Sequence, residues 1–222
     1  MIRHVLGARR RRRADELVQL DRWRVARRQL DEDVTVLGEQ LAELHVDTLG
    51  GDLDPETFDH YRRALTYYDQ AKHLLAVSTR VDDLVDVEQV IADARYHRAA
   101  VIALRDGAPV PLRRDPCFFD PRHGPSVQDV EWSPPGGAPR RIAVCAADAR
   151  HLTAGEAPLE RLVRVGDRWV PWHLAGEARD AVDAGARLAH QSGHGVHGQQ
   201  NLAQAYLNQA VNGVSGPNSP FS

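Results

Sequence analysis

The chain has 222 residues, of which 42% are hydrophobic and 27% are charged, and its formal net charge is −3 at pH 7. This length corresponds to one or two domains with enough apolar side chains to form a buried core. No apolar run reaches the ~18 residues of a membrane-spanning helix, and the arginine-rich start lacks the apolar segment of a secretory signal. We therefore expect a cytoplasmic protein.

Charge is distributed unevenly along the chain. Residues 1–28 contain ten arginines and three acidic residues, whereas residues 29–93 contain sixteen acidic residues and four basic ones. The acidic stretch would repel a long nucleic-acid duplex, but the basic end is able to contact an anionic surface. A basic N-terminal segment, residues 1–13, is therefore a candidate for weak contact with an anionic membrane or a nucleic acid through Arg9, Arg10, Arg11, Arg12 and Arg13.

Three helices are predicted over residues 14–107, where they would form an antiparallel bundle. The first is long and coiled-coil-like, from Ala14 to about Thr48, because its apolar residues recur every three or four positions; they include Leu30, Leu37, Leu41 and Leu44. The second runs over 55–78 behind the capping residue Asp54, with Phe58, Tyr61, Leu65, Tyr68 and Leu75 on its apolar face. The third begins at Asp82 or Asp83 and ends at Gly107.

The first helix is expected to be longer than its two partners. Its basic first third, with Trp23 on the apolar side, is therefore the predicted place for self-association or for a protein partner.

After Gly107 the sequence predicts a β-rich module over residues 108–176. Strands are expected over 127–132, 141–144, 162–165 and 168–172, and Gly166 with Asp167 would form a two-residue hairpin turn. A short helix from Ala175 to about Leu188 and a flexible tail complete residues 177–222. The predicted fold class is α+β.

Two cysteines lie at the edges of the first predicted hairpin. Cys117 and His123 precede it, and Cys145 and Asp148 follow it on the first turn of a short helix that would end near Gly155. A thiolate and an imidazole, then a hairpin, then a ligand pair on a helix is the layout of a treble-clef zinc site. We predict structural zinc bound by Cys117, His123, Cys145 and Asp148, with His151 as an alternative fourth ligand.

Other interpretations of the two cysteines remain open. They would also be consistent with two buried apolar thiols or with a Cys117–Cys145 disulfide in an oxidising compartment. A catalytic pair of Cys117 and His123 is disfavoured, because no third residue that would orient the histidine is evident.

The same segment resembles a family of uncharacterised actinobacterial proteins. The resemblance covers roughly residues 94–176 and rests on CFFDPRHGPS at 117–126, PPGG at 134–137 and VCAAD at 144–148. It implies the knuckle-like module and no activity. Where similar proteins have a CxxC element, this chain has CxxD.

The sequence therefore predicts a non-enzymatic scaffold or adaptor with a structural metal knuckle. No glycine-rich phosphate loop, nucleophile elbow or pair of carboxylates in a pocket motif points to a small-molecule substrate. The alternative is a peripheral membrane-surface or nucleic-acid binding protein that uses the N-terminal arginines.

Overall fold

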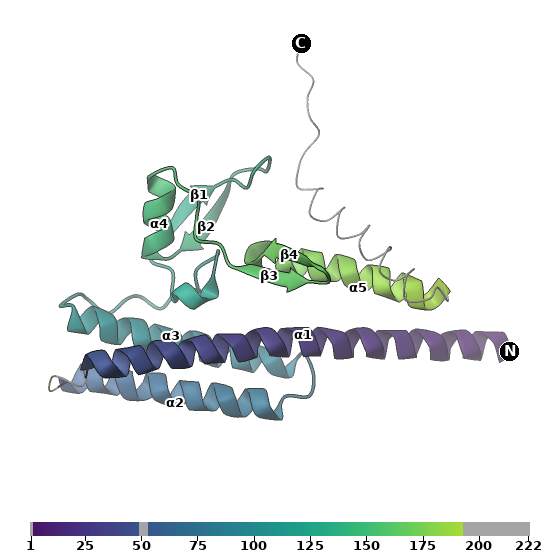
Figure 1. Cartoon of the computed structure of the whole chain (residues 1–222), viewed down its shortest axis with the longest axis horizontal. Coiled ribbons are helices and arrows are strands. Elements are labelled where there is room, and N and C mark those ends of the chain that lie inside the picture. Colours follow the sequence, from purple (N-terminus) through teal and green to yellow (C-terminus); the bar gives the residue numbers. More distant parts are fainter. Residues whose placement is uncertain (1, 49–52, 193–222) are drawn as a thin grey trace, which may run out of the picture. The chain divides into compact units, whose positions relative to one another are not determined.

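The computed structural model describes residues 2–48 and 53–192 (Figure 1). The chain is mostly helical and contains two small antiparallel hairpins, which confirms the predicted α+β class. It divides into two compact units. One consists of residues 20–129 and 143–158, and the other of the described parts of 1–19, 130–142 and 159–222. The tail predicted beyond residue 192 lies outside the described residues.

The first helix, α1 (Ile2–Thr48), is 47 residues long and begins earlier than predicted. The expected start at Ala14 was wrong because nothing in the preceding residues stops a helix. They contain no proline, and arginine is a good helix former. The segment 1–13 therefore belongs to α1 from Ile2 onward. No helix among the described residues has the length and apolar character needed to cross a membrane.

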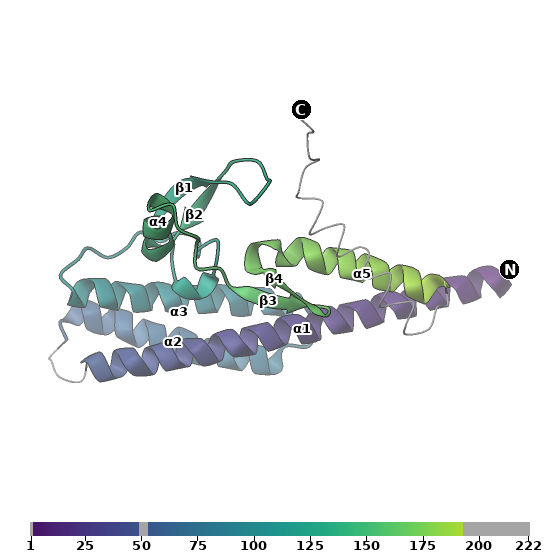
Figure 2. The same ribbon diagram turned by 45° about the horizontal axis from the view of Figure 1, so that its top comes forward.

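Helices α2 (Pro55–Val77) and α3 (Asp83–Arg105) lie beside α1 in both views (Figures 1 and 2). Side chains of all three helices join in one buried cluster, which we call the helical core. It contains Leu30, Val34, Leu37, Leu41 and Leu44 of α1, Ala64, Ala71 and Leu75 of α2, and Leu84, Val87, Val90, Ile91, Ala94 and Val101 of α3. The apolar repeat predicted along the first helix therefore does face the core.

The buried face of α2 agrees with the predicted one in part. Leu75 is in the helical core and Tyr61 and Tyr68 pack against it, but Phe58 and Leu65 are exposed. The prediction also omitted three smaller residues that are buried, Thr57, Ala64 and Ala71. On α1 the small residue Gly38 leaves room for a large side chain of α2: a Cβ atom there would lie only 2.6 Å from the hydroxyl oxygen of Tyr68.

Both predicted helix caps are present, but one works differently from the prediction. Asp54 accepts hydrogen bonds of 3.0 Å from the backbone N–H groups of Glu56 and Thr57 at the start of α2. At the start of α3, Asp82 occupies the N-cap position without a side-chain cap bond. Asp83 instead accepts from the backbone N–H groups of Thr79 and Arg80, so it stabilises the turn between the two helices.

A buried histidine lies where α2 and α3 meet. His97 is 5% exposed, its Nδ1 lies 2.8 Å from Nδ1 of His60, and its ring stacks on Tyr67 at 5.5 Å between centroids. Burial is the main factor that lowers the pKa of His97 to about 4, and the nearby charges of His60 and Arg63 act in the same direction. The folded protein therefore favours the neutral imidazole.

Because of His97, we expect the protein to lose stability in mild acid. Between pH 6.5 and about 4 the unfolded chain binds a proton at His97 that the folded chain does not, so the free energy of unfolding falls as pH falls, by up to about 3 kcal/mol. Urea denaturation of the metal-free protein at several pH values measures this dependence. His97→Gln should reduce it and leave the similar contribution of His173, whose pKa burial also lowers to about 4. His73→Gln, at an exposed position of α2, should leave it unchanged. Equal pH dependence in all three proteins would contradict the assignment.

The remaining elements match the predicted strands and short helices closely. The first hairpin pairs β1 (Gln128–Trp132) with β2 (Arg140–Val144), and α4 (Ala146–Thr153) follows it. The second pairs β3 (Leu162–Val165) with β4 (Arg168–Pro171) around Gly166, whose φ is 62°. Helix α5 (Ala175–Ser192) comes next, and its Ala175 and Ala178 share a buried cluster with the hairpin residues Val163, Val165 and Val170.

Candidate metal centre

The four predicted ligands are held by two short loops and the start of a helix. The backbone N–H of Cys117 donates to the carbonyl of Gly124 at 3.0 Å, which closes a loop around the short 3₁₀ helix η1 (Pro121–His123). Gly124 has a φ of 91°, a conformation that favours glycine. This loop therefore brings His123 back toward Cys117.

Hydrogen bonds to β2 bring the second pair of ligands to this loop. The N–H of Phe118 donates to the carbonyl of Ala143 at 3.0 Å, and the N–H of Val127 donates to that of Val144 at 2.9 Å. The next residue, Cys145, is the N-cap of α4, and its Sγ accepts the backbone N–H of Asp148 at 3.4 Å. The cap therefore fixes the distance between Cys145 and Asp148.

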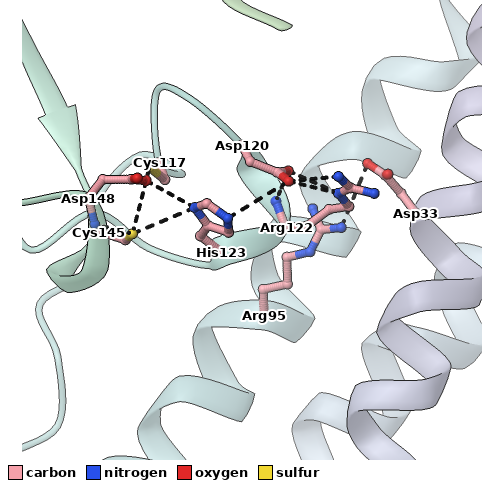
Figure 3. Close-up of polar contacts among 8 residues, drawn as sticks. All are labelled: Asp33, Arg95, Cys117, Asp120, Arg122, His123, Cys145 and Asp148. Carbon is pink, nitrogen blue, oxygen red and sulfur yellow. Dashed lines mark hydrogen bonds and ion pairs between the residues drawn. The ribbon is translucent and has the colours of Figure 1, made fainter. Parts of the chain in front are cut away.

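The side chains of Cys117, His123, Cys145 and Asp148, which we call the knuckle cluster, point toward one another (Figure 3). Oδ2 of Asp148 lies 3.1 Å from Sγ of Cys117, 3.3 Å from Sγ of Cys145 and 3.0 Å from Nδ1 of His123. Nδ1 of His123 lies 3.7 Å from Sγ of Cys145. All four ligand atoms lie within 4.8 Å of one another, so the cluster could hold a metal ion.

These distances agree with the geometry of a four-coordinate ion. Bonds of about 2.3 Å to sulfur and 2.0–2.2 Å to nitrogen or oxygen place neighbouring ligands of a tetrahedron roughly 3.3–3.8 Å apart. The observed separations of 3.0, 3.1, 3.3 and 3.7 Å fall close to that range. Small movements of the side chains are therefore enough to surround an ion.

Most of the knuckle cluster is shielded from water. Cys117 is 1% exposed, Cys145 6% and Asp148 0%, and only the side chain of His123 reaches the surface. Both cysteines are free thiols in the structure. A buried carboxylate beside two thiols and an imidazole is costly unless a cation or several hydrogen bonds compensate its charge.

The pKa values of the two thiols in the cluster are shifted in opposite directions. The hydrogen bond with Cys145, together with burial, raises the pKa of Cys117, whereas the same bond lowers the pKa of Cys145. The pKa of His123 is raised to about 8, mainly by its interaction with Cys117, while burial opposes this and Asp120 adds to it. Without an ion, Cys117 therefore remains a thiol and Cys145 is the thiol that ionises more readily.

His151, the alternative fourth ligand, lies outside the knuckle cluster. Nδ1 of His151 lies 2.9 Å from Oε2 of Glu156, and His151 is not among the four residues whose ligand atoms converge. Asp148 is therefore the fourth donor of the observed group.

The predicted interaction residues lie on α1. Arg9, Arg11, Arg12 and Arg13 are exposed there, and the side chain of Arg10 is outside the described residues. Trp23 packs against the helical core, and the guanidinium of Arg27 lies 5.9 Å from the centre of its ring. Two leucines of the same helix, Leu17 and Leu20, are exposed.

Four charged residues near the knuckle cluster were not anticipated. Asp120 and Arg122 lie beside His123, while Asp33 of α1 and Arg95 of α3 form a buried ion pair at 3.7 Å (Figure 3). The Asp-Pro pair at 120–121 is a helix-start signal that would have identified Asp120 as a cap. Asp33 lies three residues after Leu30 on the apolar seam. A charged residue at such a position is unusual, and this would have singled out Asp33.

Comparison of the chain with protein-family models, with curated proteins and with solved structures gave no match.

Proposed function

We propose that this protein is a non-enzymatic scaffold or adaptor whose knuckle cluster binds one structural zinc ion. The observation that carries the proposal is the convergence of four donor atoms, from the loop at 117–124 and the start of α4, within 4.8 Å. A zinc ion would join residues 117–123 to residues 145–148 and would so stabilise the fold of both.

The donor set favours zinc among the common protein metals. Two thiolates and an imidazole are soft or borderline ligands that suit zinc, whereas magnesium and calcium require oxygen donors. The order of elements is that of a treble clef: a loop with two ligands, the hairpin of β1 and β2, and a helix whose first turn carries two more. We interpret residues 117–153 as a treble-clef-like knuckle on this basis.

A structural role is favoured over a catalytic one. Zinc in a closed structural site has four protein ligands, whereas a catalytic zinc keeps one position for water or substrate. The four donors here would fill the tetrahedron, and three of the four residues are buried.

We assign the partner-binding role to the helices. We interpret α1, α2 and α3 as an antiparallel three-helix bundle in which α1 extends beyond the two shorter helices. The exposed Leu17 and Leu20 on α1 give this helix apolar side chains that a second copy of the chain or another protein would cover. Trp23, which was predicted as an interaction residue, packs against the helical core, so we assign it a supporting role beneath this surface.

Contact with an anionic membrane or a nucleic acid through Arg9–Arg13 has less support. Consecutive residues of an α-helix point in directions about 100° apart, so five neighbouring arginines surround α1 instead of forming one basic face. No aromatic residue lies among these arginines, so the segment has no side chain on which bases could stack.

Metal analysis of the purified protein tests the proposal. The full chain, expressed without a polyhistidine tag, should contain about one zinc per chain by elemental analysis. Its thermal midpoint should fall when a strong chelator is added and recover when zinc is returned, because the ion binds only the folded cluster. Metal far below one equivalent, together with a thermal midpoint that chelator does not change, would overturn the zinc assignment.

A further inference from the structure

His123 lies between two carboxylates, one on each side of its ring (Figure 3). Its Nδ1 faces the knuckle cluster, 3.0 Å from Oδ2 of Asp148. Its Nε2 faces outward, 3.9 Å from Oδ2 of Asp120. An imidazole that binds a metal through Nδ1 must carry its proton on Nε2, and a carboxylate on that side favours this tautomer.

Asp120 is held in place by several hydrogen bonds. It is 5% exposed, and its Oδ1 accepts the backbone N–H of Arg122 at 2.9 Å as the cap of η1. The guanidinium of Arg122 also donates to both carboxylate oxygens, from Nε at 3.0 Å and from Nη2 at 2.8 Å. These hydrogen bonds and the positive charge of Arg122 compensate the negative charge of the buried carboxylate and fix its orientation.

Near Arg122, Asp33 of α1 and Arg95 of α3 form an ion pair whose two side chains are almost fully buried (Figure 3). The guanidinium of Arg122 itself donates to Asp120 and is 30% exposed. Arg122 therefore fixes the carboxylate of Asp120, and the Asp33–Arg95 pair is a separate contact between the helices.

We propose that Asp120 is a positioning residue of the metal centre: its negative charge favours the proton of His123 on Nε2, so that Nδ1 is available to the ion, and Arg122 fixes the carboxylate of Asp120. This inference rests on the proposed zinc site and adds two residues that do not touch the ion. Carboxylates that orient a metal-binding histidine in this way commonly contribute 10–100-fold to metal affinity.

The chain offers a variant that isolates the charge of Asp120 from its capping role. Asparagine caps helices about as well as aspartate and still accepts the N–H of Arg122, but it lacks the negative charge. Asp120→Asn should therefore bind zinc 10–100-fold more weakly than the wild type in competition with a chromogenic chelator. Arg122→Gln should give an intermediate loss, and Asp115→Asn, at an exposed position before the loop, should give none.

Two further measurements separate positioning from simple damage to the fold. The thermal midpoint of the chelated, metal-free protein should be nearly the same for Asp120→Asn and wild type. Nitrogen-15 NMR of the histidines in the zinc-loaded wild type should show Nδ1 of His123 bound to metal and Nε2 protonated, with that signature weakened in Asp120→Asn and restored in Asp120→Glu.

The outcomes distinguish this inference from the proposed function. If the wild type binds no zinc, both the zinc assignment and the positioning role fall. If the wild type binds one zinc and Asp120→Asn binds it equally well, or if His123 binds through Nε2, the zinc site stands and the positioning role is refuted.

Discussion

Replacement of Cys145 by serine is expected to abolish stoichiometric zinc binding and to destabilise the protein. Serine is a good N-cap, so the variant keeps the hydrogen bond that starts α4 while it removes one thiolate donor. At a free zinc concentration of 100 times the dissociation constant, the ion stabilises the fold by about 2.7 kcal/mol. For a chain of this size that corresponds to a fall of roughly 5–10 °C in the thermal midpoint when binding is lost.

The control for this experiment is the other candidate ligand on the same helix. His151→Gln removes an imidazole that is paired with Glu156 outside the cluster, so this variant should retain about one zinc per chain. Elemental analysis and thermal unfolding of both variants, with and without chelator, give the comparison. A Cys145→Ser protein that retains one zinc, or a His151→Gln protein that loses it, would show that the ligand set is wrong.

The second large effect is expected at the buried ion pair between α1 and α3. Arg95→Met removes the guanidinium that pairs with Asp33, which is 4% exposed, and loss of one partner of a buried pair typically costs about 3–5 kcal/mol. The double variant Asp33→Leu/Arg95→Met removes both charges and should recover most of that loss, because apolar side chains of similar size suit the surrounding core.

Urea denaturation with chelator present measures these changes without a contribution from metal. Arg80→Met is the matched control, since Arg80 forms an ion pair with Asp83 while its own side chain is 74% exposed, and such pairs contribute at most about 1 kcal/mol. Equal stability of Arg95→Met and Arg80→Met would contradict a buried, energetically important pair. A double variant no more stable than Arg95→Met would show that the cost of Arg95→Met does not come from the charge of Asp33, and would contradict the assignment.

Residues with a strong local signal were the ones that sequence alone placed correctly. The seam of leucines along α1, the cap Asp54, the start of α4 near Cys145, and the turn at Gly166 and Asp167 each depend on neighbours a few positions away. The knuckle cluster was also identified, because a hairpin returns the chain so that ligands on its two sides meet. Only local geometry was needed for these predictions.

Features that depend on the fit between helices were missed. Whether Thr57, Ala64 and Ala71 or Phe58 and Leu65 are buried depends on how α2 packs against the other helices. The burial of His97 and Arg95 on α3 likewise depends on partners from other helices, His60 and Asp33. The pattern of apolar residues along one helix does not show which residues of another helix will lie against it. Polar residues beside an apolar seam are therefore predicted to be exposed to solvent.

Cys145 performs two tasks with one sulfur atom: it begins α4, and it is a donor of the knuckle cluster. An isolated helix of eight residues is unstable in water, because the unfavourable free energy of nucleation exceeds the favourable free energy of its few backbone hydrogen bonds. If the cluster binds zinc as proposed, the ion would support the start of α4, and exchange of metal with the surroundings would be coupled to the local stability of this helix.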